Sequence, residues 1–184
     1  CADRKVTDSG AGGTAISTGK KTYYHAIGVN KDTIPQKTLL EYAKQKGKKT
    51  AILVSCDLTH ATPACFISHV KDRDMQEDIA KYYLTENCDI FLGGGLKRFT
   101  PNTRKDKENL IDSLKERGYE IVYNEKELNQ AKSDKIAGFF ADEHLPLVKD
   151  RGDIEQKFLD KTLEAFSKDT NGFFIMLEGS QIDM

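Results

Sequence analysis

Two groups of polar residues in this chain have the types and spacing for chemistry on a phosphate or a metal ion. The first is the segment VTDSGAGGTAISTGK, in which Ser9 follows Asp8 and precedes several glycines. Helix-forming residues continue from Ser9 to Gly19, and the free N–H groups and positive dipole end of a helix start favour phosphate. A serine placed there becomes a nucleophile if a metal ion or a base lowers the cost of deprotonating it. The alternative is a plain helix N-cap, with Asp8 or Ser9 as the capping residue.

The second group follows two apolar runs, each of which predicts a buried strand. The run KTAILVS is followed by Asp57, Thr59, His60 and Thr62, and the run GFFIML by Glu178 and Asp183. If the two strands are parallel and adjacent, these groups converge at one sheet edge, where their oxygens suit a divalent cation. The alternative is that Thr62 only caps a helix with Pro63 at its first position, and that the acids are solvated.

Strand and helix signals alternate along the rest of the chain. This alternation predicts an α/β fold with a mainly parallel β-sheet flanked by helices and joined by right-handed crossovers. The polar stretch from Pro101 to Glu108 predicts an exposed loop. The predicted helices are Thr38 to Gly47, one opening at Thr62, Met75 to Thr85, Asn109 to Arg117, Glu125 to Ala131 and one from Ile154 to Phe166, and the predicted strands are Lys49 to Ser55, Asp89 to Leu92, Glu120 to Val122, Lys135 to Phe139 and Gly172 to Leu177.

Composition narrows the class of protein. The chain has 184 residues, 38% of them hydrophobic and 31% charged, with a formal net charge of -1. That length suits one domain, the balanced charge argues against a nucleic-acid binder, and no apolar run is long enough to span a membrane. The four cysteines form no CxxC pair, so we expect buried thiols, although spacing alone does not exclude a disulfide; they are Cys1, Cys56, Cys65 and Cys88.

Five sequence blocks, in order, resemble the alkaline phosphatase family. They are VTDSGAGGTA with the following STGKKT and AIGV, HATPACFISHVKDR, DIFLGGGLKRF, GFFADEHLPL and GFFIMLEGSQID. One block is weak evidence, but five in the same order span nearly the whole chain. The resemblance implies an alkaline phosphatase-like partial core, with residues 1–184 as a single partial catalytic domain truncated at both ends.

The resemblance also implies roles in phosphoryl transfer. Ser9 matches the nucleophile, which forms a phosphoserine and also contacts a metal ion. Arg73 matches the arginine that binds phosphate, and its guanidinium fork suits two phosphate oxygens. Asp8 matches the acid that orients this arginine.

The metal sites implied by the resemblance are two zinc ions and one magnesium ion. Thr62 and Glu178 match magnesium ligands, and Asp183 matches a zinc ligand. His60 stands where the family has either aspartate or histidine, acting mostly through water, and an imidazole there leaves the identity of the third metal open. The remaining ligands are expected before the first and beyond the last residue of this chain, so we expect incomplete or absent metal sites here. The other histidines match no ligand position; they are His25, His69 and His144.

The function implied is hydrolysis of phosphate monoesters by the parent protein, with negligible activity in residues 1–184 alone. The implied partners are small phosphorylated substrates, with no nucleic acid, no membrane span and a possible homodimer, in a periplasmic or secreted location. Two alternatives remain: a non-catalytic phosphate- or metal-binding relative, and a phosphodiesterase or sulfatase-like enzyme of the same superfamily.

Overall fold

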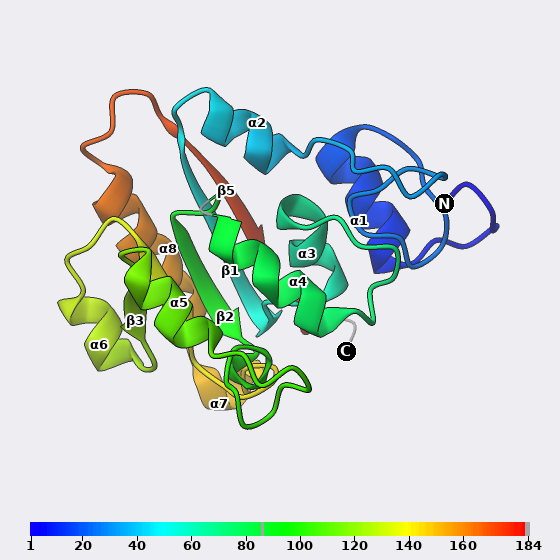
Figure 1. Ribbon diagram of the computed structural model, residues 1–184. Helices are drawn as coiled ribbons and strands as arrows, with labels where there is room; N and C mark the ends of the chain where they lie inside the picture. The colour runs from blue at the N-terminus through cyan, green and yellow to red at the C-terminus, as the bar shows by residue number, and fades with distance from the viewer. Residues whose placement is uncertain (86, 183–184) are drawn as a thin grey trace.

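A five-stranded parallel sheet forms the centre of the computed structural model, which describes residues 1–85 and 87–182. Within these described ranges the strand order is β3-β4-β2-β1-β5, and every neighbouring pair is parallel. The predicted α/β class with a mainly parallel sheet is therefore confirmed (Figure 1). The strands are β1 (Lys49–Asp57), β2 (Ile90–Gly94), β3 (Glu120–Val122), β4 (Ile136–Phe139) and β5 (Phe173–Glu178).

Helices cover both faces of the sheet. Consecutive strand residues point to opposite faces, so Ile52 belongs to the core cluster that includes residues of α2, α3, α4 and α5, while Leu53 belongs to the one that includes residues of α6 and α8. The α-helices are α1 (Ser9–Thr18), α2 (Leu39–Gln45), α3 (Ala61–Ile67), α4 (Gln76–Tyr82), α5 (Leu110–Glu116), α6 (Glu125–Gln130), α7 (Val148–Arg151) and α8 (Ile154–Phe166), with 3-10 turns at Tyr83–Thr85 and Leu96–Arg98.

The predicted start of α3 is wrong. His60 is the N-cap residue, and Thr62 is the second residue of the helix and caps nothing. Pro63 is the third residue, where its missing N–H is not needed because the first N–H groups of a helix have no intrahelical partner. The cause is that β1 continues to Asp57, two residues beyond the apolar run, and the turn after it sets where α3 begins.

The loop from Pro101 to Glu108 contains no helix or strand, as predicted, but it is not wholly exposed. The side chain of Arg104 is buried and bonds to Asp106 and to the carbonyl oxygens of Glu77 and Arg98. A buried guanidinium needs such partners to offset its desolvation. Arg104 therefore ties the loop to α4 and to the 3-10 turn after β2.

Small residues let α1 approach α3 closely. A Cβ atom on Gly13 would lie 3.0 Å from Cys65 Sγ, which itself lies 3.1 Å from the carbonyl oxygen of Gly10. Thr14 sits in the same contact and bonds the carbonyl oxygen of Ala26. The glycine-rich segment is thus explained by helix packing at Gly13, whereas a Cβ on Gly12 would have only ordinary contacts.

All four cysteines are free thiols; Cys56, Cys65 and Cys88 are buried, as expected, whereas Cys1 is only partly buried. Burial raises the pKa of Cys65 to about 12, so this thiol behaves as a small apolar group beneath α1. In the described part of the chain, no helix combines the length and the apolar character needed to cross a membrane.

We expect Gly12→Ala and Gly13→Ala to change stability in opposite directions. Alanine at position 12 should raise the free energy of unfolding by about 0.5–1 kcal/mol through helix propensity. Alanine at position 13 must displace the Cys65 thiol and should lower the free energy of unfolding by about 1–3 kcal/mol. Urea unfolding of the two variants measures this, and equal effects of the same sign would contradict the packing account.

Candidate active site

Asp8 organises the start of α1. It is the N-cap residue, and its side chain accepts hydrogen bonds from the N–H groups of Gly10 and Ala11, both at 3.0 Å. Ser9 is the first residue of the helix and is exposed. Of the two capping alternatives, the structure therefore selects Asp8 and leaves the Ser9 hydroxyl free of that role.

The same carboxylate holds two segments that are distant in sequence. The N–H of His25 donates to Asp8 Oδ1 at 3.2 Å, and Arg73 Nη1 donates to Asp8 Oδ2 at 3.3 Å. The N–H of Arg73 in turn donates to the carbonyl oxygen of His25 at 2.9 Å. Ser9 and Arg73 are thus held beside each other through Asp8.

The hydrogen bonds to Asp8 keep it ionised. Burial acts to raise the pKa of this carboxyl group, but the N–H groups of Ala11, His25 and Gly10 and the Arg73 side chain outweigh it. The pKa of Asp8 consequently lies below its ordinary value. The negative charge of Asp8 therefore interacts favourably with the positive end of the α1 dipole and with the guanidinium of Arg73.

The carboxyl ends of β1 and β5 meet at this site, as predicted. The two strands are parallel neighbours, with Val54 opposite Glu178. A cavity of about 460 Å³ opens at their ends and is bounded on one side by α1. Its lining residues are Ser9, Gly12, Gly13, Ile16, His60, Thr62, Arg73, Glu178 and Ser180.

Two residues expected at this edge face elsewhere, and one lies outside the described residues. Asp57 is buried and accepts from the N–H and hydroxyl of Thr59, away from the cavity. The turn between β1 and α3 therefore uses these two side chains for its own hydrogen bonds. Asp183 lies outside the described residues.

His60 presents an uncharged imidazole to the cavity. Burial first, and then the nearby charge of Arg73, lower the pKa of His60, although Glu178 and Asp57 act against this. His60 Nε2 lies 3.4 Å from Arg73 Nη2, while Nδ1 is buried without a hydrogen-bond partner among the described residues. A guanidinium only donates, so Nε2 is the acceptor in this contact and the proton of the neutral ring lies on Nδ1, which can donate to a water molecule.

The residues present fit part of a metal site. Thr62 and Glu178 add a hydroxyl and a carboxylate to the imidazole of His60 within the same cavity. Such oxygens suit a hard cation, whereas the imidazole also suits zinc. Ser180, which was not expected in the site, donates to Glu178 Oε2 at 2.9 Å and so orients that carboxylate.

His144 also contributes to this region, although it matched no ligand position. Its Nδ1 accepts the N–H of Asp57 at 3.0 Å, and its ring lies 5.7 Å from the ring of His60, edge to face. His144 therefore supports the turn that carries His60. No local pattern in the sequence pointed to this contact across 87 positions.

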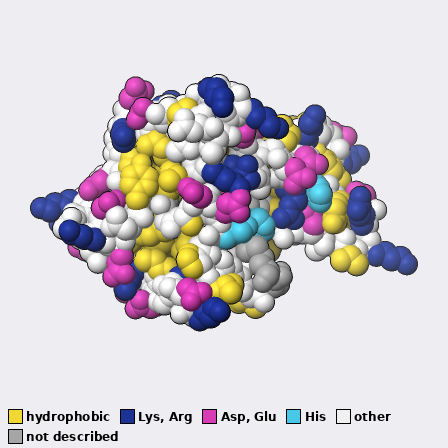
Figure 2. Space-filling view, turned by 90° about the horizontal axis from the view of Figure 1, so that it is seen from below, with side chains coloured by type: hydrophobic (Ala, Val, Ile, Leu, Met, Phe, Trp, Pro, Cys, Tyr) yellow, Lys and Arg dark blue, Asp and Glu magenta, His cyan; other side chains and the backbone are white. Residues whose placement is uncertain are grey.

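The face of the molecule that carries this site is seen in Figure 2, viewed from the side toward which β1 and β5 run in Figure 1. Histidine side chains are exposed there beside both acidic and basic ones.

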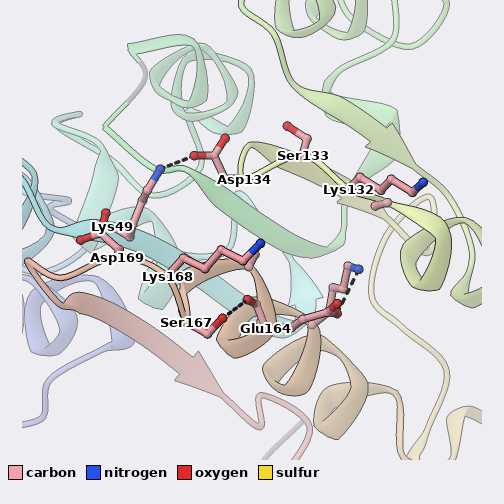
Figure 3. A pocket seen from close by; sticks show the side chains of 11 residues that line it. Lys49, Lys132, Ser133, Asp134, Glu164, Ser167, Lys168 and Asp169 are labelled. Atoms are coloured by element: carbon pink, nitrogen blue, oxygen red, sulfur yellow. Dashed lines mark hydrogen bonds and ion pairs between the residues drawn. The ribbon is translucent and has the colours of Figure 1, made fainter.

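A larger cavity, of about 630 Å³, lies at the opposite edge of the sheet (Figure 3). It is lined by Lys49 at the start of β1 and by residues before β4 and β5. Lys49 forms an ion pair with Asp134, and Lys161 forms one with Glu164. Because these charges compensate one another at the amino ends of the strands, this cavity is the weaker candidate for catalysis.

Comparison with known proteins gives one consistent result. The family model described as alkaline phosphatase matches residues 1–184. Alkaline phosphatase 3 of Bacillus subtilis is 42% identical over 190 residues, covering 98% of this chain and 40% of the relative. The repressible alkaline phosphatase of Saccharomyces cerevisiae is 36% identical, covering 98% of this chain and 38% of the relative. The chain thus spans less than half the length of these curated relatives.

Comparison with solved structures gives the same family. Alkaline phosphatase from the Antarctic bacterium TAB5 superposes with a TM-score of 0.93 at 38% identity, covering 99% of this chain and 54% of that one. A histidine-to-aspartate mutant of that enzyme, with magnesium bound in its M3 site, superposes with a TM-score of 0.90 at 38% identity, covering 97% of this chain and 52% of that one.

We expect Asp8→Ala to lower the free energy of unfolding by about 1–2 kcal/mol at neutral pH, and Asp8→Asn to cost less because an amide oxygen still caps a helix. Since the folded-state pKa of Asp8 is depressed, its charge-dependent stabilisation is complete above about pH 4 and is lost as the pH falls through the folded-state value. Urea unfolding between pH 7 and pH 3 should therefore show the gap between wild type and Asp8→Asn narrowing in acid. A constant gap would show that the charge of Asp8 is unimportant.

Proposed function

The chain belongs to the alkaline phosphatase family, and from this premise we propose that the protein of which it forms a part hydrolyses phosphate monoesters with Ser9 as nucleophile. The observation that carries the proposal is that Ser9 and Arg73 line one cavity with His60, Thr62 and Glu178. On family likeness alone we also propose that residues 1–184 form a single partial catalytic domain, and that the whole protein is periplasmic or secreted and can form a homodimer.

Ser9 is proposed to attack phosphorus while the substrate alcohol leaves on the opposite side. The product of this first displacement is a phosphoserine, which water then attacks in a second in-line displacement. Two inversions give overall retention at phosphorus. The exposed position of Ser9 at the first residue of α1 supports this role, since the positive helix terminus favours the phosphoryl charge.

Arg73 is proposed to bind two oxygens of the phosphoryl group. Asp8 holds one guanidinium nitrogen, Nη1, and the Nη2 side faces His60 in the cavity. The planar fork would then meet the phosphoryl group in a fixed orientation, with charge-assisted hydrogen bonds that strengthen as negative charge develops. A terminal phosphoryl group offers more free oxygens for this contact than a diester does, which supports monoesters as the substrate class.

His60, Thr62 and Glu178 are proposed to hold part of a magnesium-type site, and Asp183 to bind zinc. The presence of the His60 imidazole and of the oxygens of the other two side chains in one cavity supports the first assignment. Bound zinc and magnesium would lower the pKa of the serine hydroxyl and offset the charge of the phosphoryl oxygens. Ser180 would keep the Glu178 carboxylate oriented toward that site.

In the full-length protein we expect Ser9→Ala to lower kcat/KM for an aryl phosphate by at least about 10³-fold, because no covalent intermediate can form. Arg73→Lys should lower it by roughly 10- to 100-fold, because an ammonium group cannot provide the planar fork. Steady-state kinetics with a monoester and a matched diester measure both effects.

The matched control is Arg117→Lys, since Arg117 bonds to the carbonyl oxygens of Leu84 and Ser113 away from the cavity. It should leave kcat/KM unchanged. Faster turnover of the diester would favour a phosphodiesterase, and no turnover of either ester would favour a non-catalytic relative.

Residues 1–184 alone should hydrolyse no measurable aryl phosphate when zinc and magnesium are supplied. The reason is that the family resemblance places further metal ligands outside this chain. Turnover by the purified chain that disappears on Ser9→Ala would show that the residues present are sufficient.

A further inference from the structure

Three metal-ligating side chains meet beside the segment that carries Arg73. One ligand atom each from His25, Asp72 and Asp74 lie within 4.8 Å of one another. His25 Nδ1 lies 3.6 Å from Asp72 Oδ1. None of the three lines the Ser9 cavity, so this cluster is separate from the proposed active site.

Main-chain hydrogen bonds fix the two segments that carry these side chains. Ile27 and Val70 pair in both directions at 3.0 and 3.1 Å, and the N–H of Arg73 donates to the carbonyl oxygen of His25 at 2.9 Å. The Tyr23 hydroxyl donates to the carbonyl oxygen of Lys71 at 2.9 Å. These main-chain and tyrosine bonds bring the three side chains together without using the ligand atoms, and one further bond, from the N–H of Asp74 to Asp72 Oδ1 at 2.9 Å, orients one of them. Such preorganisation is what a metal site requires.

The two carboxylates of the cluster form no ion pair with a lysine or arginine among the described residues. Among the described residues, the ion partner of Asp72 is His25, whose imidazole is a cation only when protonated, and Asp74 has no ion pair. Arg73 directs its guanidinium to Asp8 instead. Two carboxylates that converge repel one another unless a cation joins them.

We propose that His25, Asp72 and Asp74 bind one divalent transition-metal ion, with zinc as the best match to the donors. One imidazole nitrogen and two carboxylate oxygens form a zinc-type ligand set that leaves a fourth position for water, whereas magnesium and calcium prefer oxygen ligands alone. Ligand atoms about 2.1 Å from a tetrahedral ion lie about 3.4 Å apart, so small side-chain rotations would complete the geometry.

The bound ion links the segment of His25 to the segment of Arg73. His25 already joins Asp8 to Arg73 through its main chain, by the N–H and carbonyl bonds described above. An ion that adds a side-chain link at the same point restricts the motion of the loop presenting the Arg73 guanidinium. This site is independent of whether the proposed phosphatase activity is correct.

The test is titration with Co²⁺, followed by its visible absorption, in a chain that carries His60→Ala and Glu178→Gln. These two changes remove ligands from the Ser9 cavity, so binding that remains reports on other sites. We expect one bound ion per chain, and at least tenfold weaker binding when Asp72→Asn and Asp74→Asn are added. Asn at position 72 still accepts the N–H of Asp74, so the local turn is kept.

The matched control is Asp32→Asn, which removes an exposed carboxylate elsewhere and should leave the affinity unchanged. Far-ultraviolet circular dichroism of each variant checks its fold, and His25→Gln serves as an independent second variant if the double change disturbs the structure. Unchanged Co²⁺ affinity in His25→Gln or in the double variant would overturn the proposal, as would the absence of any bound ion in the His60→Ala and Glu178→Gln chain.

Discussion

The carboxylate of Asp8 is the interaction on which the candidate site depends. It receives the first free N–H groups of α1, the N–H of His25 and one nitrogen of Arg73. Three segments that are separate in sequence are therefore held by one charged group, and their hydrogen bonds keep that group ionised. Ser9 follows directly from the cap, so its position relative to the guanidinium is set by the same contacts.

The parallel sheet supplies the second half of the site. Pairing of β1 with β5 brings His60, the N-cap residue of α3, and Thr62 in its first turn next to Glu178, with no direct bond needed between them. The close packing of α1 on α3 at Gly13 then sets the Ser9 helix over this edge. The backbone geometry thus places the Glu178 carboxylate and the His60 imidazole in one cavity.

Much of the fold could be predicted from local pattern. The runs KTAILVS and GFFIML each indicate a buried strand, and the glycine-rich opening indicates a helix start near Ser9, but that the two strands are neighbours is shown by the structure. Local pattern failed at the turn after β1: the strand continues to Asp57, so the helix cap predicted at Thr62 lies at His60 instead, and the Asp57 carboxylate bonds to Thr59 within the turn. The pairing of Asp8 with Arg73 spans 65 positions, and no periodicity can indicate such a contact. That pairing was expected only from family resemblance, and the contact of His144 with the turn after β1 was not expected at all.

The central claim, that Asp8 and the sheet edge hold Ser9 as a nucleophile, is tested most directly by mapping phosphorylation. The full-length protein would be mixed with a phosphate monoester, quenched in acid and digested, and the peptide containing Ser9 examined by mass spectrometry. The account predicts one phosphoryl group on Ser9, absent in Asp8→Ala or strongly reduced there. Hydrolysis of the ester with no phosphoryl group on Ser9, or with one on a different residue, would contradict it.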